Sequence, residues 1–218
     1  MPRRPVRPNS ELVERVLRLL EDAGVPWSPR WLAIDGGDEV VSWIDGVAAG
    51  SGADVDLDAL ARMVRELHDL TATLGPGLLA GSECVIHDDL QPRNVIVRDG
   101  HPVGLIDWEQ ARPGRRIEDV ADLCWSFVEP TPGSDPAERG RRWRDVVDAY
   151  DLGDDSRPAL VPTALARMVV CIDDIERHAA AGSTRHQVLA DRGDHLGIRV
   201  MLDWTTAHRE QLHHAILF

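Results

Sequence analysis

Two short segments hold the residues whose types and spacing could do chemistry: residues 87–94, with the sequence HDDLQPRN, and residues 107–109, with the sequence DWE. A short apolar run leads into the first segment, and a hairpin around an Asp-Gly turn separates the two segments. Asp89, Asn94 and Asp107 can therefore converge at one end of a small sheet. A carboxylate and an amide oxygen suit Mg²⁺, which keeps several waters and takes further oxygens from phosphates. A carboxylate that is not needed as a ligand can accept a proton from an attacking hydroxyl.

The elements that must position these residues follow from the periodicity of the apolar residues. An Asn-Ser pair before Glu11 predicts a helix that starts near residue 10 and ends near Ala23. Further helices are predicted over 57–74, 117–127, 135–150, 158–181 and 184–215. Strands are predicted over 30–34 and 39–44, which form a hairpin, and over 84–86, 95–98 and 103–106. The Gly-rich segment 45–54 is predicted to link two lobes, and the order of the elements indicates an α+β fold.

Composition limits the classes of protein and partner. The chain has 218 residues, 43% hydrophobic and 28% charged, which is enough for one domain or for two small lobes that share a core. A net charge of −13 argues against nucleic acid as the main partner and favours a cationic small molecule. No apolar run approaches the roughly 20 residues of a membrane span, and no secretory signal follows the basic N-terminal residues. We therefore expect no membrane partner.

Two residue types restrict the chemistry further. All 24 basic residues are Arg, so a Lys nucleophile, a Schiff base and a phosphate-gripping Lys are excluded. The cysteines Cys84, Cys124 and Cys171 lie far apart and form no CxxC pair. Their spacing predicts reduced thiols in the cytoplasm, with neither a zinc site nor a disulfide framework.

The spacing within residues 87–109 matches the catalytic core of kinases, where a catalytic Asp is followed by a metal-binding Asn and then by a strand-end Asp that binds Mg²⁺. The chain more closely resembles the aminoglycoside phosphotransferase family, kinase-like enzymes that act on small molecules. The usual pattern of that family is H-G-D-x-x-P-x-N followed by I-D-W-E. The matching residues are His87, Asp89, Pro92 and Asn94, and then residues 106–109. DVA at 119–121, LHD at 67–69 and VSWIDG at 41–46 also match, so the resemblance covers about residues 10–128.

The resemblance implies a role for each residue of this core. Asp89 would be the catalytic base, and His87 would position the loop rather than transfer protons. Asn94 and Asp107 would hold Mg²⁺, while Glu109 would either assist the metal or orient Asp107. ATP would be the phosphoryl donor, and a hydroxyl group of a small molecule would be the acceptor.

The resemblance also implies a protein-kinase-like fold of two lobes. Residues 1–46 would form a reduced nucleotide-binding lobe made of a helix, a hairpin and a hinge. Residues 47–218 would form a mostly helical lobe that carries the catalytic residues and binds the acceptor. The hinge backbone at Ser42, Trp43 and Ile44 would hold adenine. Asp119 would tie the catalytic loop by hydrogen bonds, and His68 would be a packed residue of its helix.

The sequence departs from the family pattern in two places. Asp88 stands where the family usually has Gly, and this second carboxylate would either raise the pKa of one of the two acids or contact a cationic substrate. The first predicted helix begins near residue 10, which leaves no room for a Gly-rich hairpin over the phosphates, and the Lys of the following strand is missing. Arg4, or its neighbours Arg3 and Arg7, could grip phosphate instead, with Glu14 as a partner.

Three functions are compatible with these observations. The first is a Mg²⁺- and ATP-dependent phosphotransferase with an alcohol acceptor, for which an aminoglycoside-like amine is one candidate. The second is a catalytically degenerate, kinase-fold binding protein that lacks the Gly-rich loop and the Lys. The third, a metal phosphohydrolase built on the pairs at 68–69 and 87–88, is disfavoured because such His-Asp pairs normally lie on helices. The acidic residues of 173–176 are interpreted as a solvated helix face rather than as a site for a substrate amine.

Overall fold

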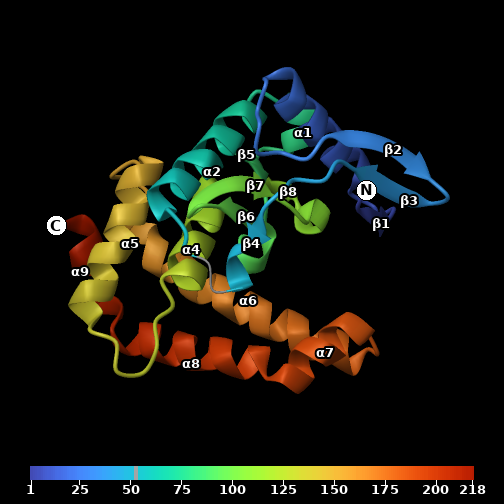
Figure 1. Cartoon of the computed structure of the whole chain (residues 1–218). Helices are drawn as coiled ribbons and strands as arrows, with labels where there is room; N and C mark the ends of the chain where they lie inside the picture. Colours follow the sequence, from blue (N-terminus) through green and yellow to red (C-terminus); the bar gives the residue numbers. More distant parts are fainter. Residues whose placement is uncertain (52–53) are drawn as a thin grey trace.

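The computed structural model describes residues 1–51 and 54–218. Most strands lie in the N-terminal half of the chain and most helices in its C-terminal half (Figure 1). The chain begins with strand β1 (Arg3–Pro5), helix α1 (Ser10–Asp22) and the hairpin of β2 (Trp31–Asp35) and β3 (Asp38–Val41). The three strands form an antiparallel sheet in the order β1-β3-β2. The predicted first helix and hairpin are confirmed, whereas β1 was not predicted.

The middle of the chain forms two further small sheets. Strands β4 (Val47–Ala48), β6 (Val95–Arg98) and β7 (His101–Leu105) pair in the order β4-β6-β7. Strand β5 (Cys84–Ile86) instead pairs with β8 (Arg112–Gly114). The pairing of β5 with β8, rather than with the following hairpin, was not predicted. A 3₁₀ turn at Pro92–Asn94 redirects the chain after β5. The backbone hydrogen-bonding partners of β5 come from β8 instead.

The segment predicted to be a linker, 45–54, is only partly a loop. It contains β4, which pairs with β6, and a 3₁₀ turn at Ala49–Ser51, while residues 52–53 lie outside the described part of the chain. Gly46, with φ +146°, passes so close to β6 that a Cβ would lie 2.7 Å from the carbonyl oxygen of Val97. The missing side chain thus lets β4 pair closely with the hairpin that follows residues 87–94.

The helices begin with α2 (Leu57–Thr71), α3 (Pro76–Leu79) and α4 (Arg116–Phe127), and continue with α5 (Pro136–Tyr150), α6 (Leu160–Ala180), α7 (Thr184–Arg192), α8 (Asp194–Ala207) and α9 (Arg209–Leu217). The single helix predicted over 184–215 is wrong, because the left-handed Gly193, at φ +79°, ends α7 and His208 ends α8. The helices α6 and α8 pack along each other, with α7 at their shared end (Figure 1).

One hydrophobic core runs through both halves of the chain. It joins the apolar face of α1 to α2, β5 and the helices α4–α6. Six of the seven Trp residues are buried, whereas Trp43 is 68% exposed. No helix in the described ranges is long and apolar enough to cross a membrane. Because the core is continuous, the loop after β5 lies on a rigid base.

Candidate active site

The loop that follows β5 is held by the buried carboxylate of Asp119, on α4. The backbone N–H groups of His87 and Asp88 donate to this carboxylate at 2.8 and 3.0 Å, and Nε2 of His68 lies 3.0 Å away. Burial raises the pKa of Asp119, but the hydrogen bond from His68 and the donors of His87 outweigh burial and lower the pKa overall. These hydrogen bonds agree with the prediction that Asp119 ties the loop in place. His68 is fully buried and also contacts the hydroxyl of Tyr150 at 2.7 Å, as expected of a packed residue.

Asp89 and Asn94 form a hydrogen-bonded pair across this loop. Nδ2 of Asn94 donates to the carboxylate of Asp89 at 2.8 Å and to its carbonyl oxygen at 2.9 Å. Because the carbonyl can only accept, the amide nitrogen must face Asp89 and the amide oxygen must face away. The carboxylate of Asp89 also accepts from Nη2 of Arg93 at 3.1 Å. The amide oxygen of Asn94 is therefore the atom left for a cation.

Asp107 lies beside Asn94 because the backbone N–H of Ile106 donates to the Asn94 carbonyl at 2.9 Å. Asp107 is in the left-handed region, with φ +64°, which Asp adopts more readily than most residues. A carboxylate and an amide oxygen are ligands that suit Mg²⁺. The donor set of Asn94 and Asp107 thus fits the metal that the sequence predicts.

His87 connects the loop to the end of β7. Its side chain is fully buried, Nε2 donates to the carbonyl of Ile106 at 3.0 Å, and the ring packs on Trp108 with centroids 4.9 Å apart. The second ring nitrogen, Nδ1, is buried without a hydrogen bond. These contacts suit the positioning role expected of His87 and show no path for proton transfer through it.

Asp88 is bound by two arginines. Its backbone is left-handed, at φ +64°, which explains why Gly suits this position in the family pattern. Its carboxylate binds Nε of Arg112 at 2.6 Å and Nη1 of Arg167 at 2.5 Å. Two guanidinium groups therefore offset the extra carboxylate.

A cavity of about 330 Å³ brings the predicted hinge and metal residues together. Its walls include Arg4, Ser42, Trp43 and Ile44 on one side and Asn94 and Asp107 on the other. Arg4 forms an ion pair with Glu39, which is 1% exposed. The partner suggested for Arg4, Glu14, is wrong, because Glu14 pairs along its own helix with Arg18 at 2.9 Å. The expected Arg–Glu pair is thus built between two strands rather than between a strand and a helix.

A second cavity, of about 280 Å³, lies on the other side of the loop. Asp89 and Arg93 line it from the loop, and α6, α7 and α8 supply most of the remaining wall. Sequence reasoning missed Arg167, which lines this cavity and binds Asp122 through Nη2 at 2.5 Å. Burial raises the pKa of Asp122 to about 7, although Arg167 opposes the shift. The only local signal for Arg167 was a charge in an otherwise apolar stretch of the helix predicted over 158–181.

Glu109 is held by two arginines. Its carboxylate lies 2.8 Å from Nη2 of Arg7 and forms an ion pair with Arg185 of α7. Nη2 of Arg185 lies 3.9 Å from the carboxylate of Asp107. The metal-assisting role of Glu109 stays a prediction, while its contacts place it in a charge network around Asp107. Arg185 was also missed, because nothing in its local sequence points to a residue so distant along the chain.

The phosphohydrolase alternative finds no support in these contacts. Asp69 is paired with Arg116 at 2.5 Å and with Arg65 at 2.9 Å rather than with a histidine. The ring of His68 and the backbone N–H of His87 both bind Asp119, and the rings of both histidines are buried. The two His-Asp sequence pairs therefore do not form one site.

Comparison with known proteins defines the class of the chain. The sequence model of the phosphotransferase enzyme family matches residues 56–156. The trifolitoxin immunity protein of Rhizobium leguminosarum bv. trifolii is 30% identical over 179 residues, which cover 71% of this chain and 69% of that protein. The chain therefore belongs to the phosphotransferase enzyme family, and the predicted resemblance is confirmed.

Solved structures show the same fold. The amicoumacin kinase hAmiN, in complex with AMP-PNP, Ca²⁺ and Ami, matches with a TM-score of 0.61 at 13% identity, over 90% of this chain and 78% of that chain. A ternary complex of streptomycin, ATP and APH(2″)-IIa matches with a TM-score of 0.53 at 14% identity, over 82% of this chain and 81% of that chain. The fold is thus the kinase-like α+β fold with a helical C-terminal part that the sequence predicts.

Proposed function

We propose that this protein transfers the γ-phosphoryl group of ATP to a hydroxyl group of a small molecule. One observation carries the proposal: two cavities meet at the hydrogen-bonded pair of Asp89 and Asn94. The cavity that includes Asn94 and the hinge residues is large enough for part of a nucleotide, and the cavity that includes Asp89 is free for an acceptor. Donor and acceptor would then approach each other across one loop.

In the proposed reaction, the acceptor hydroxyl lies against the carboxylate of Asp89. Its oxygen forms a bond to the γ-phosphorus while the bond from that phosphorus to the β–γ bridging oxygen breaks, and ADP leaves. The hydroxyl proton passes to Asp89. The hydrogen bond from Asn94 and the backbone bonds to Asp119 fix the position of this carboxylate. Asn94 and Asp107 would hold Mg²⁺, which supplies charge neutralisation at the phosphates when bound.

The nucleotide would lie between residues 1–46 and the β6–β7 hairpin. Ser42, Trp43 and Ile44 would contact adenine, and the Arg4–Glu39 pair would lie beside the phosphates in place of the missing Lys. We propose on this basis that residues 1–46 form the reduced nucleotide-binding lobe and that residues 47–218 form the catalytic and acceptor-binding lobe.

The charge of the second cavity favours a cationic acceptor. Five aspartates line it against three arginines, and Arg167 already pairs with two of these aspartates, Asp88 and Asp122. The arginines that pair with Asp89, Asp174 and Asp194 are exposed, so a small molecule that carries amino groups could take their place at these carboxylates. An aminoglycoside-like amine is therefore the first class of acceptor to test.

A second candidate function is binding without turnover. The strand β1 is three residues long, and the structure has no Gly-rich hairpin within its described ranges to cover the phosphates. Water would then reach the γ-phosphate more freely, which disfavours transfer to an acceptor. The curated relative is named as an immunity protein for trifolitoxin, and protection against a toxin is compatible with binding or with phosphoryl transfer.

The two functions separate in a binding and turnover experiment. Thermal unfolding is measured with ATP alone, Mg²⁺ alone and both, and ADP formation is then followed with and without amine-bearing alcohols. ATP and Mg²⁺ at about 100 times the dissociation constant should raise the Tm by about 5–10 °C. Acceptor-dependent ADP formation supports the transferase, and a Tm shift without turnover supports the binding protein.

The matched variants are Asp107→Asn and Asp99→Asn. Both aspartates are left-handed, at φ +64° and +51°, but Asp99 is an exposed residue of the β6–β7 turn. Asp107→Asn should abolish the Tm shift caused by Mg²⁺ and ATP, and Asp99→Asn should keep it. Equal shifts in the two variants, or no shift in the unsubstituted protein, would refute the nucleotide site.

A further inference from the structure

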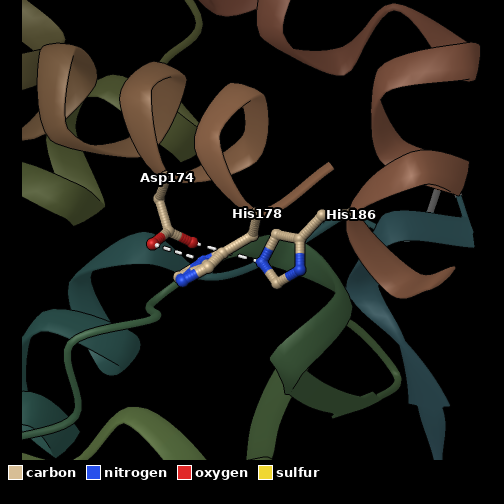
Figure 2. Close-up of side chains that lie close together, drawn as sticks. All are labelled: Asp174, His178 and His186. Carbon is tan, nitrogen blue, oxygen red and sulfur yellow. Dashed lines mark hydrogen bonds and ion pairs between the residues drawn. The ribbon is translucent and has the colours of Figure 1, made fainter. Parts of the chain in front are cut away.

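Three side chains with metal-binding atoms meet at the junction of α6 and α7, apart from the residues assigned to ATP and Mg²⁺. They are Asp174, His178 and His186, and their nearest nitrogen and oxygen atoms all lie within 4.8 Å of one another. Figure 2 shows the carboxylate of Asp174 and the two imidazole rings turned toward a common point. His178 Nδ1 lies 3.5 Å from one carboxylate oxygen, and His186 Nε2 lies 3.2 Å from the other.

The local fold explains this convergence. Asp174 and His178 are four residues apart on α6, so both side chains lie on the same face of that helix. Gly182, left-handed at φ +89°, then reverses the chain, and the backbone N–H of Ser183 bonds to the carbonyl of His178 at 3.0 Å. His186 lies in the first turn of α7 and is carried back onto Asp174. Asp173 and Glu176 are exposed, as the solvated face predicts, whereas Asp174 is partly buried and contacts both histidines.

Each histidine presents one ring nitrogen to Asp174, His186 through a hydrogen bond of Nε2 at 3.2 Å and His178 through Nδ1 at 3.5 Å. Ser183 Oγ lies 2.7 Å from Nδ1 of His186 and can donate or accept there. When it accepts, Nδ1 carries the hydrogen and Nε2 offers a lone pair toward Asp174, the arrangement in which a second group orients a metal-binding histidine. Nδ1 of His178 is shielded from solvent and makes no hydrogen bond. A cation between these atoms would satisfy both nitrogens and the carboxylate.

We infer that Asp174, His178 and His186 form a binding site for a divalent transition metal of the zinc class. Zn²⁺ binds imidazole nitrogen and carboxylate oxygen at about 2.0–2.2 Å, so adjacent ligands of a tetrahedral ion lie about 3.3 Å apart. His186 Nε2 and His178 Nδ1 lie 3.2 and 3.5 Å from different oxygens of Asp174, and one ligand atom from each of the three residues lies within 4.8 Å of the others. Small rotations of the side chains would bring these atoms to the tetrahedral spacing. The cysteines excluded as zinc ligands by their spacing take no part, because this donor set contains only nitrogen and oxygen.

Three protein ligands leave the fourth coordination position of a tetrahedral metal ion open. Asp174 and His186 also line the cavity beside Asp89, so the open position lies at the edge of that cavity. The residue before His186 is Arg185, which pairs with Glu109 and approaches Asp107. A bound metal would join the first turn of α7 to α6 and would thereby fix Arg185. Arg177, whose guanidinium lies 3.3 Å from Asp174, is 70% exposed and can turn aside into solvent.

Metal binding can be measured without any assay of activity. The protein is first treated with a chelator, and Zn²⁺ is then titrated against a competing chromophoric chelator of known affinity. We expect one equivalent to bind, and we expect saturating Zn²⁺ to raise the Tm by about 5–10 °C. Co²⁺ in place of Zn²⁺ should give the visible absorption of a four-coordinate nitrogen and oxygen site. His186→Gln and His178→Gln should each weaken Zn²⁺ binding at least about tenfold.

His101→Gln provides the matched control. His101 Nδ1 lies 3.5 Å from Asp56, the same separation as between His178 and Asp174, but His101 is 71% exposed. His101→Gln should bind Zn²⁺ like the unsubstituted protein. Equal losses in all three variants, or no loss in any, would show that zinc binds to scattered surface histidines and would overturn the inference. Absence of binding to the unsubstituted protein would overturn it as well, and neither result depends on the proposed phosphoryl transfer.

Discussion

The loop that carries Asp89 should depend on the buried carboxylate of Asp119, and Asp119→Asn tests this dependence. One oxygen of Asp119 accepts from His68 Nε2 and the backbone N–H of His87, and the other accepts from the N–H of Asp88. Asn keeps the shape but replaces one acceptor by an NH₂ donor. The least costly orientation turns that NH₂ toward Asp88, so that one bond to a charged group is lost and one buried N–H has no acceptor.

The two losses determine the expected magnitude. A hydrogen bond to a charged group contributes about 1.5–3 kcal/mol, and an unsatisfied buried N–H costs about 1–3 kcal/mol. We therefore expect Asp119→Asn to lower the free energy of unfolding by about 3–5 kcal/mol, which corresponds to a Tm lower by roughly 10 °C. Because the pKa of Asp119 is lowered in the folded state, its stabilisation is complete at neutral pH and is lost as the pH falls below about 4. The difference between the variant and the unsubstituted protein should shrink in the same range.

Urea unfolding at pH 7 and at pH 3–4 measures both effects, and backbone hydrogen exchange reports on the loop itself. The amides of His87 and Asp88 should exchange faster in Asp119→Asn, while amides of α9 should not change. Asp191→Asn, at an exposed position, is the control for the chemical change and should lie within about 0.5 kcal/mol of the unsubstituted protein. A loss below about 0.5 kcal/mol in Asp119→Asn, or unchanged exchange in the loop, would refute the reasoning.

Three further predictions concern the two cavities. A Cβ at Gly104 would lie 2.9 Å from the side chain of Ile44, so Gly104→Ala should push Ile44 into the proposed adenine site. The substitution should lower the free energy of unfolding by about 1–3 kcal/mol and weaken ATP binding several-fold in a titration. Unchanged affinity for ATP would contradict this prediction. The folded-state pKa of Asp122 is raised to about 7, so its contribution to stability falls as the pH rises from about 4 to 7, by up to roughly 1.4 kcal/mol per unit. Asp122→Asn should flatten that part of the urea-unfolding profile, and an unaltered profile would count against the shift. Arg185→Gln removes a positive charge 3.9 Å from a predicted metal-binding carboxylate and should strengthen Mg²⁺-ATP binding about fivefold in calorimetry, whereas weaker binding would contradict the assignment.

The parts of the site that the sequence could predict are those that lie close together along the chain. Asp89, Asn94 and Asp107 are joined by one loop and one hairpin, so their spacing carries most of the geometric information. The role of Asp119 came from the family resemblance, and its three hydrogen bonds agree with that role. The helix α1 and the β2–β3 hairpin were also predictable, because apolar periodicity and an Asp-Gly-Gly-Asp turn are local signals.

The parts that could not be predicted depend on contacts between distant segments. Arg167 and Arg185 reach the loop from α6 and α7, and the position of such helices follows from packing rather than from local sequence. The pairing of β5 with β8 also joins segments on opposite sides of the hairpin. The break at Gly193 had a local signal, a glycine within the periodic stretch, but apolar periodicity on both sides made one long helix the better match.

The replacement of Gly by Asp at position 88 has a consequence for how the two sides of the loop are connected. A glycine would keep the backbone bonds of the loop, including the one from Arg167 to the carbonyl of residue 88, whereas the carboxylate of Asp88 adds bonds to Arg112 beside β5 and to Arg167 on α6. Arg167 in turn binds Asp122, so a helix that lines the proposed acceptor cavity is attached directly to the residue next to Asp89. Removal of one partner would leave a buried charge uncompensated, which is costly, so these charges are stable only as a set. A change in α6 at the proposed acceptor cavity should therefore reach Asp89 through the ion pairs of Asp88 and Arg167, which hold the loop against α6.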